Sequence, residues 1–150
     1  YTIIRHSNIY GPHDKYDLDK SHVFGATITK VMRAKETLEV WGNGKEIRDF
    51  LHADDLVNFV KKAIRKQKKP YEIFNCGSGS PITVKDLCKK IIKISRKDIE
   101  IKFNKAKPSI PFDMYLDCNR AKKEIGWTPQ IEIDKGIKKT ISWWKKNIKK

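Results

Sequence analysis

The chain has 150 residues and a formal net charge of +15, from 33 Lys and Arg against 18 Asp and Glu. It holds no apolar run near the roughly 20 residues that span a bilayer and no signal-peptide pattern, so we expect a cytoplasmic protein of one domain without a membrane partner. Only 6 of the 33 basic residues are Arg, the side chain that reads bases best, so we expect mostly solvated surface charge and no nucleic-acid partner.

The first third of the chain predicts a strand, a loop, a helix and a second strand. Tyr1–Asn8 is rich in strand-forming residues, and a Gly-Pro pair turns the polar loop Tyr10–Lys20 that follows. Ser21 is the expected N-cap of a helix that runs to about Lys35, because apolar residues recur there at helical spacing. A short strand, Leu38–Trp41, comes next.

The middle third predicts a strand, a helix and another strand. Extended Ile47–His52 precedes a helix that Asp54 or Asp55 begins, since acidic side chains favour the positive end of a helix dipole. We interpret both aspartates as helix starters and not as catalytic acids. Tyr71–Asn75 is the next strand, and the Gly-Ser-Gly-Ser run at 77–80 is a strand-to-helix turn, because it lacks the Lys-[Ser/Thr] of a phosphate-binding P-loop.

The last third predicts three helices and one strand. Thr83 resembles the start of a capping box, with Asp86 in place of the usual Glu, and should begin a helix. The remaining elements are a strand at Glu100–Phe103, a short helix at Asn119–Ile125 and a last helix at Ile133–Lys146. Gly126 should end the short helix in the left-handed conformation, and the tail 145–150 should fray.

Helices and short strands are thus mixed along residues 1–150 without regular β-α-β alternation, which predicts one small α+β domain. No internal repeat or low-complexity linker divides the chain. It does not begin with Met, and we interpret it as part of a longer protein.

The cysteines indicate a reducing compartment and not a metal site. Cys76, Cys88 and Cys118 form no Cys-x-x-Cys pair, and no Cys/His set has the spacing of zinc ligands. An odd and sparse count is typical of proteins without disulfides. We expect free, buried thiols and no bound metal.

A polar, histidine-bearing loop follows the first strand and is the most informative stretch of the chain. It reads Asn8-Ile-Tyr-Gly-Pro-His13-Asp14 and, after a short spacer, Ser21-His22-Val23. The amide of Asn8 offers a donor and an acceptor, either to a ligand or only to its own turn. His22 can exchange a proton near neutral pH, although a lone histidine is more often structural.

A second group of motifs lies at residues 41–55. The turn at 41–44 reads Trp-Gly-Asn-Gly, and its glycines permit a close approach to the backbone. Residues 48–52 read Arg-Asp-Phe-Leu-His, and two aspartates follow. The guanidinium of Arg48 can bond two phosphate oxygens at once, or it can form an ion pair with Asp49 or Asp55. Both readings of Arg48 stay open.

These motifs, in this order, resemble the GDP-L-fucose synthases of the extended short-chain dehydrogenase/reductase family, within the NAD-dependent epimerase/dehydratase superfamily. The likeness runs from Asn8 to Trp144 but covers only the C-terminal half of such an enzyme. It implies a substrate-binding lobe of mixed helices and short strands, whose residues 1–8 are a strand of the otherwise missing Rossmann sheet. That strand would lack its neighbours and expose an open edge.

The resemblance also assigns roles to individual residues. It implies that Asn8 lies beside the substrate and that Arg48 binds the nucleotide diphosphate. His22 would be the acid that protonates the sugar during C3/C5 epimerisation, whereas His13 would only shape the loop. Substrate contacts are further implied for Lys30, Trp41 and Lys107. From the residues alone, the two lysines also suit solvated surface, and the tryptophan also suits a core.

The cofactor-binding half is the part of the family that the chain does not match. There is no Gly-x-x-Gly-x-x-Gly and no Tyr-x-x-x-Lys. For the complete enzyme the resemblance implies NADP (or NAD) bound mainly by that half, a homodimer formed mainly through it, and a nucleotide-diphosphate sugar as substrate. For this fragment alone we expect no cofactor and no reductase activity.

The leading hypothesis is therefore the substrate-binding part of a GDP-4-keto-6-deoxy-mannose 3,5-epimerase/4-reductase. The alternative within the superfamily is the corresponding lobe of a UDP-sugar 4-epimerase or a dTDP-sugar dehydratase. The alternative from another class is a basic nucleic-acid-binding module. A catalytically silent lobe that serves as an assembly surface also stays open.

Overall fold

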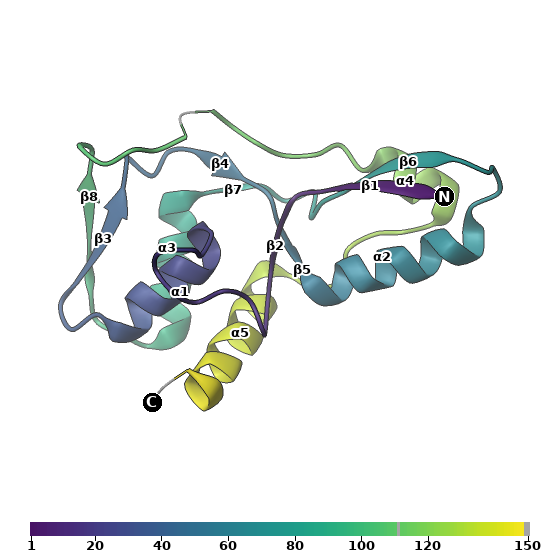
Figure 1. Ribbon diagram of the computed structural model, residues 1–150. Helices are drawn as coiled ribbons and strands as arrows, with labels where there is room; N and C mark the ends of the chain where they lie inside the picture. The colour runs from purple at the N-terminus through teal and green to yellow at the C-terminus, as the bar shows by residue number, and fades with distance from the viewer. Residues whose placement is uncertain (111, 149–150) are drawn as a thin grey trace.

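The computed structural model describes residues 1–110 and 112–148, in which short strands and helices are mixed along the chain (Figure 1). The strands are β1 (Thr2–His6), β2 (Asn8–Tyr10), β3 (Thr37–Trp41), β4 (Ile47–Arg48), β5 (Phe50–His52), β6 (Glu72–Cys76), β7 (Ile82–Thr83) and β8 (Glu100–Asn104). The helices are α1 (Val23–Arg33), α2 (Ala53–Lys66), α3 (Val84–Ser95), α4 (Asn119–Ile125) and α5 (Ile133–Asn147). The expected α+β class is confirmed.

The strands pair two by two. β1 pairs with β6, β2 with β5 and β3 with β8, all in parallel, whereas β4 and β7 pair antiparallel. The parallel pairing was not predicted, because each such pair joins segments that are far apart in the sequence and need a long crossover. β1 keeps β6 as a neighbour along its whole length, so the expectation that this strand loses its neighbours is wrong for one of its edges.

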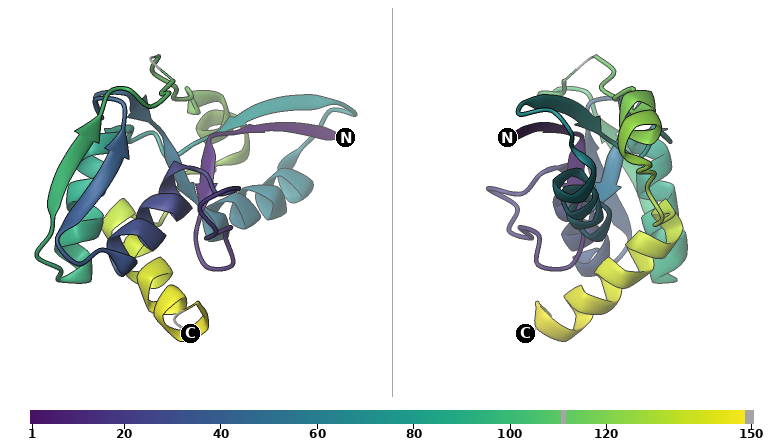
Figure 2. Two further views of the ribbon diagram at one scale, coloured as in Figure 1. Left: turned by 60° about the vertical axis from the view of Figure 1, so that its left-hand side comes forward. Right: turned by 90° about the vertical axis from the view of Figure 1, so that its right-hand side faces the viewer.

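Two hydrophobic cores lie side by side. The larger core packs α1, α3 and α5 against each other and against the β3–β8 pair, on the left of Figure 1. The smaller core packs α2 and α4 against β6, on the right. β2 and β5 run between the two cores (Figure 2). Segments next to this strand pair can therefore bring residues from the larger and the smaller core together.

The part of the molecule that contains β1 and α2 exposes apolar side chains. Tyr1, Ile3, Val57, Val60 and Ile64 are all exposed. A hollow of about 500 Å³ lies between the start of β1 and the last turns of α2. Strands of parallel sheets are normally covered on both faces and paired on both edges, so this apolar surface is unusual for a separate domain.

The helix ends follow the sequence with two corrections. The N-cap of α1 is His22 and not Ser21, and the helix ends at Arg33, where Lys97 donates hydrogen bonds to the carbonyls of Met32 and Ala34. Thr83 caps α3 as expected, through its hydroxyl. α5 continues through Asn147, beyond the point where fraying was expected, and 149–150 lie outside the described residues.

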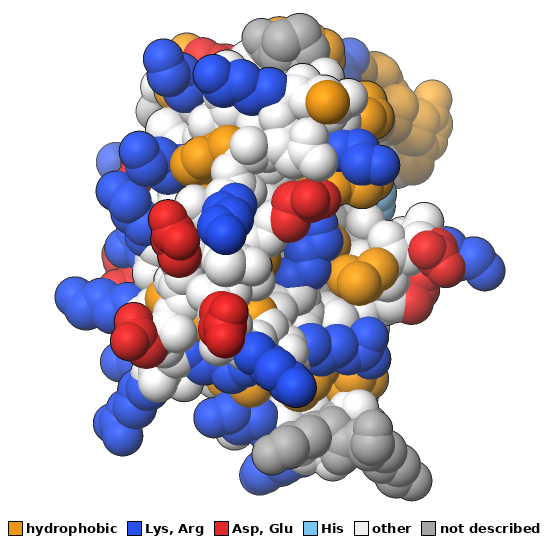
Figure 3. All heavy atoms as spheres, turned by 90° about the vertical axis from the view of Figure 1, so that its left-hand side faces the viewer, with side chains coloured by type: hydrophobic (Ala, Val, Ile, Leu, Met, Phe, Trp, Pro, Cys, Tyr) orange, Lys and Arg blue, Asp and Glu red, His pale blue; other side chains and the backbone are white. Residues whose placement is uncertain are grey.

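Charged side chains are spread over the surface. Figure 3 shows the face of β3, β8 and α3, where lysines and arginines lie among acidic side chains and form no single patch. No described helix is long and apolar enough to cross a membrane.

Candidate functional site

Arg48 lies at the end of β4, in the middle of the molecule, and is only 7% exposed. Its guanidinium donates to three backbone carbonyls: Nη1 to Ile47 (2.8 Å) and Phe112 (2.7 Å), and Nη2 to Ile110 (2.9 Å). These bonds use three of the five N–H donors of a guanidinium. Two donors, one on Nε and one on Nη2, have no partner within residues 1–110 and 112–148.

The two carboxylates that could have paired with Arg48 bind backbone amides instead. Asp49 is fully buried and accepts the N–H of Ser78 at 2.9 Å. Asp55 is also buried and accepts the N–H of Gln130 at 2.9 Å. Among the described residues neither carboxylate forms an ion pair with Arg48, so that alternative is wrong. Asp54 and Asp55 are confirmed as residues of the first turn of α2.

A segment that we call the strap, residues 109–110 and 112–115, runs beside β4 and supplies two of the three carbonyls. The carboxylate of Asp113 accepts the N–H of Ile47 at 2.9 Å. Met114 donates its N–H to Ile47 (3.0 Å) and accepts the N–H of Asp49 (3.1 Å), which places it beside Arg48 in a parallel bridge. Sequence reasoning missed this contact, because the strap holds Arg48 through backbone atoms that any residue type provides.

Trp41, Lys30 and Lys107 come together beside the other end of the strap. The Nζ atom of Lys30 lies 5.3 Å from the centroid of the Trp41 ring, and the Nζ atom of Lys107 lies 5.6 Å from it. The indole is 47% exposed, so it is not the core residue that the sequence also allowed. Lys107 precedes the strap by two residues, so one short segment joins this cluster to Arg48.

Hydrogen bonds fix the cluster to the β3–β8 pair. Glu39 accepts the indole N–H of Trp41 at 3.1 Å and the side-chain amide of Asn104 at 3.3 Å. Asn104 pairs with Trp41 in the strand register and accepts the backbone N–H of Lys107 at 3.3 Å. The position of the Lys107 backbone is therefore set by the same strand that carries Trp41.

Asn8 lies next to the segment that carries Arg48. β2 pairs in parallel with β5, with Asn8 opposite Phe50. The side-chain amide of Asn8 donates to the carbonyl of Asp49 at 3.0 Å, so one donor holds the backbone beside Arg48. The amide oxygen has no partner among the described residues, in agreement with either reading of Asn8.

His22 and His13 occupy different environments. His22 is exposed at the N-cap of α1 and near Asp14, where burial raises the carboxyl pKa and the charge of His22 lowers it. His13 has a positive φ of 67° and lies against the ring of Trp143, with centroids 4.7 Å apart. Within residues 1–110 and 112–148, no hydrogen bond or ion pair joins His22 to Arg48, and their convergence on one ligand stays a prediction.

His52 is a buried residue whose role the sequence did not reveal. Its Nδ1 atom accepts the N–H of Asp54 at 3.2 Å and so caps α2, where Asp or Ser is the usual cap. Burial lowers the pKa of His52, against the opposing effect of Asp54. Its Nε2 atom and the hydroxyl of Tyr10 are both buried without a partner among the described residues.

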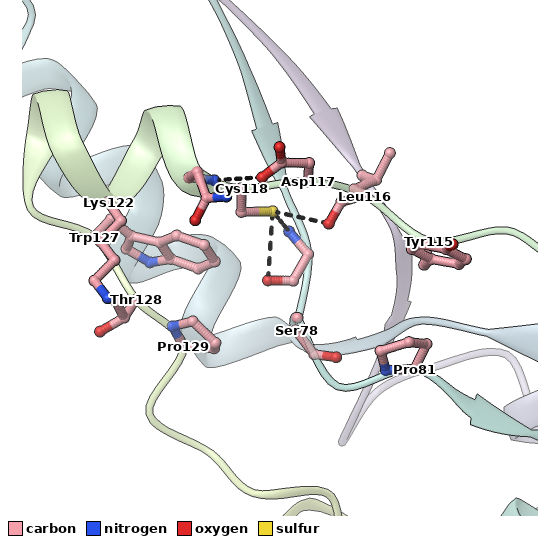
Figure 4. A pocket seen from close by; sticks show the side chains of 13 residues that line it. Ser78, Pro81, Tyr115, Leu116, Asp117, Cys118, Lys122, Trp127, Thr128 and Pro129 are labelled. Carbon is pink, nitrogen blue, oxygen red and sulfur yellow. Dashed lines mark hydrogen bonds between the residues drawn. The ribbon is translucent and has the colours of Figure 1, made fainter.

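A hollow of about 390 Å³ lies beyond the strap and contains none of the expected site residues (Figure 4). It is formed by the turn after β6, the segment before α4 and the link after it, with Tyr115, Cys118 and Trp127 on its walls. The Cys118 thiol is half-buried, and burial raises the pKa of Cys76 and of Cys88 to about 12. All three cysteines are free, as expected.

Lys30, Lys107 and Trp41 form a cationic cluster with one exposed aromatic ring, and the strap that follows Lys107 in the sequence bonds the Arg48 guanidinium. A guanidinium with two remaining donors suits a phosphate, and an indole edged by ammonium groups suits an anionic ligand with a flat or sugar-like part. In the part of the chain that the structure describes, no group of three or more His, Cys, Asp or Glu is placed to hold a metal ion.

Comparisons with known proteins give one family. The NAD dependent epimerase/dehydratase family model matches residues 1–77, just over half of the chain. GDP-L-colitose synthase of Yersinia pseudotuberculosis is 33% identical over 141 residues, which cover 91% of this chain and 46% of that protein. A probable GDP-L-fucose synthase of Oryza sativa subsp. japonica is 30% identical over 146 residues, which cover 95% and 44%.

A solved structure gives the same result. The crystal structure of UDP-glucose 4-epimerase with UDP-glucose from Thermotoga maritima matches with a TM-score of 0.87 and 29% identity, over 99% of this chain and 47% of that one. The resemblance found in the sequence is confirmed. The chain spans about half the length of the curated relatives that it matches.

Proposed function

Because the chain belongs to the NAD-dependent epimerase/dehydratase family, we propose that it is the nucleotide-sugar-binding half of an epimerase/reductase most similar to GDP-L-fucose synthase. The observation that carries the proposal is the exposed indole of Trp41 with two ammonium groups, those of Lys30 and Lys107, beside it; the strap that follows Lys107 in the sequence also bonds the Arg48 guanidinium. A nucleotide-diphosphate sugar has the two features that this set suits: two adjacent phosphates and a flat base.

We assign the diphosphate to Arg48 and Lys107, and the base or the sugar to Trp41. Lys30 adds a second ammonium beside the ring, and Asn8 positions the backbone at Asp49 while its amide oxygen faces the ligand. His22 is the proposed acid for epimerisation, because an exposed imidazole can donate a proton near neutral pH. The names of two similar proteins describe GDP-sugar synthases.

We place the NADP (or NAD) site on the other half of the complete enzyme, because the residues here do not fit a dinucleotide. At the Gly77-Ser78-Gly79 turn the amide of Ser78 is already bonded to the buried carboxylate of Asp49. A Cβ added to Gly77 would overlap that same carboxylate. A phosphate at this turn would therefore meet a negative charge where it needs amide donors.

We also propose that the other half packs against the exposed apolar residues of β1 and α2. β1 is paired with β6 on one edge, and Tyr1, Ile3 and Ile64 are exposed beside it. A further parallel strand along β1 would cover these side chains and pair the open edge. The expected homodimer of the complete protein would then form mainly through the half that is not part of this chain.

A UDP-sugar 4-epimerase lobe is the second candidate, and the match to the Thermotoga maritima structure with UDP-glucose favours it. A calorimetric titration of GDP-, UDP- and dTDP-sugars into the purified chain separates the two. We expect the GDP-sugar to bind best, and Arg48→Ala to weaken binding about tenfold or more, since it removes a charge-assisted bidentate contact. Arg65→Ala, an exposed arginine on α2, is the matched control and should change nothing.

A clear preference for UDP-sugars would make the second candidate the better one. No binding of any nucleotide sugar, by the chain alone or together with a cofactor-binding half, would overturn the proposal. Sub-micromolar binding of duplex or single-stranded nucleic acid at physiological salt would favour the basic-module alternative instead.

The proposed role of His22 must be tested in the complete enzyme. We expect His22→Gln to stop epimerisation while it changes the affinity for the nucleotide sugar by less than about threefold, because glutamine is similar in size and its amide cannot act as an acid near neutral pH. Equal losses of turnover and affinity would assign His22 to binding only.

A further inference from the structure

The strap is attached at both ends, close to two residues that we propose bind the ligand, Lys107 and Arg48. At its N-terminal side Lys107 is fixed to Asn104, which pairs with Trp41. Near its C-terminal side Asp113 and Met114 bind Ile47, the residue before Arg48. Lys107 and Asp113 are six residues apart in the sequence, so these attachments fix the backbone at both ends of the strap.

The strap carbonyls also accept two of the N–H donors of Arg48, which limits the donors that are left for a ligand. The carbonyls of Ile110 and Phe112 take one donor on Nη2 and one on Nη1, and Ile47 takes the second donor on Nη1. The remaining donors, on Nε and Nη2, are of the kind that bind two oxygens of one phosphate. Without the strap carbonyls, the guanidinium could turn and offer other pairs of donors.

We propose that Asp113 is a positioning residue: it anchors the strap so that the Arg48 guanidinium presents Nε and Nη2 to a diphosphate. The proposal rests on the proposed function for its ligand but not for its geometry. Asp113 is exposed, so it contributes little to either core, and its carboxylate accepts the N–H of Ile47 at 2.9 Å. Its neighbours Ile110 and Phe112 contribute their carbonyls to the hydrogen bonds of Arg48.

A ligand-free measurement tests the geometry. In ¹⁵N-arginine spectra of the chain, the Arg48 Nη signals should be resolved, because hydrogen bonds to three carbonyls slow rotation of the guanidinium, and Arg48→Lys identifies them. Asp113→Ala should broaden or remove these signals. Asp113→Asn keeps an oxygen acceptor for Ile47 and should retain them. Unchanged Arg48 signals in Asp113→Ala would overturn the proposal.

Met114→Pro is a second variant that should change the Arg48 Nη signals. It removes the N–H that Met114 donates to Ile47 at 3.0 Å and leaves Asp113 in place. Asp117→Ala is the matched control, since that exposed carboxylate accepts only the nearby N–H of Asn119. We expect the signals to change in Met114→Pro and to be retained in Asp117→Ala.

Ligand affinity then tests the positioning. With GDP as the probe, Asp113→Ala should weaken binding roughly tenfold and Asp113→Asn less than about threefold. An affinity equal to that of the unaltered chain, together with changed Arg48 signals, would overturn the positioning role. If the unaltered chain binds no nucleotide diphosphate, the proposed function fails, whereas the anchoring of Arg48 is still decided by the spectra.

Discussion

The carboxylate of Asp55 accepts the backbone N–H of Gln130 at 2.9 Å, and in doing so it joins the first turn of α2 to the segment that leads into α5. The second oxygen accepts the N–H of Ile131 at 3.0 Å. Trp127 adds a bond from its indole N–H to the Asp55 carbonyl at 3.2 Å. One aspartate therefore connects the smaller core to the last helix of the larger one.

Asp55→Ala should destabilise the fold by about 2–4 kcal/mol, because it removes a buried carboxylate and leaves two partly buried N–H groups without their acceptor. The free energy of unfolding in urea measures this. Asp54→Asn is the matched control. Its carboxylate forms an exposed ion pair with Lys139 at 2.8 Å, so its loss should cost less than about 1 kcal/mol. Equal costs for the two changes would contradict the role of Asp55.

The pair Asp54–Asp55 shows which features of the fold can be predicted from the sequence and which cannot. Two acidic residues before an apolar helical stripe correctly predict a helix start, since the reason is local. Which of the two is buried depends on Gln130 and Ile131, some 75 residues later, and no local pattern carries that information. For the same reason the helices were predicted well and the parallel strand pairs were not.

His52 should make the stability depend on pH. Burial lowers its pKa below the ordinary value of 6.5, so in the folded state the ring stays neutral and its Nδ1 caps α2. As the pH falls below 6.5, His52 binds a proton in the unfolded chain but not in the folded chain. The free energy of unfolding therefore decreases until the pH reaches the pKa of His52 in the folded state. We expect the free energy of unfolding to fall between pH 7.5 and pH 5, as about one extra proton binds to the unfolded state.

His52→Asn serves as the reference for this prediction, because asparagine can also cap a helix and does not titrate. The variant should show a smaller decrease over the same pH range. The difference between the two curves belongs to His52 and to its neighbour Asp54, whose pKa is lowered by Lys139 and by the charge of His52. Parallel curves would mean that His52 is protonated equally in both states.

Gly136 and Tyr10 should be coupled. A Cβ added at Gly136 on α5 would overlap the Tyr10 hydroxyl and approach ring atoms Cζ and Cε2 at 2.7 and 2.8 Å. Gly136→Ala should therefore destabilise by about 1–3 kcal/mol, although alanine is normally the better helix former by about 1 kcal/mol. In a Tyr10→Phe background the cost should fall by about 1 kcal/mol, and additive effects would show that the overlap is relieved elsewhere.

Part of the candidate site could be predicted from the sequence and part could not. Trp41, Lys30 and Lys107 were expected to share a ligand on the strength of the resemblance, and the structure brings them together. The hydrogen bonds from Arg48 to the carbonyls of Ile110 and Phe112 could not be predicted from the sequence, because every residue type has a backbone carbonyl. The ion-pair alternative for Arg48 was wrong because Asp49 and Asp55 bind amides in the folded chain.

Lys107 should contribute to affinity through its charge beside the Trp41 ring. Lys107→Gln should weaken GDP binding about three- to tenfold at low salt, because an ammonium near a phosphate gains most where screening is weak. The loss should shrink as salt rises toward 0.5 M, where the Debye length is only a few ångströms. Lys105→Gln, two residues earlier and also exposed, is the control and should leave the affinity within about twofold. Similar losses for the two variants would show that net charge, and not the position of Lys107 at the indole, draws the nucleotide to this surface.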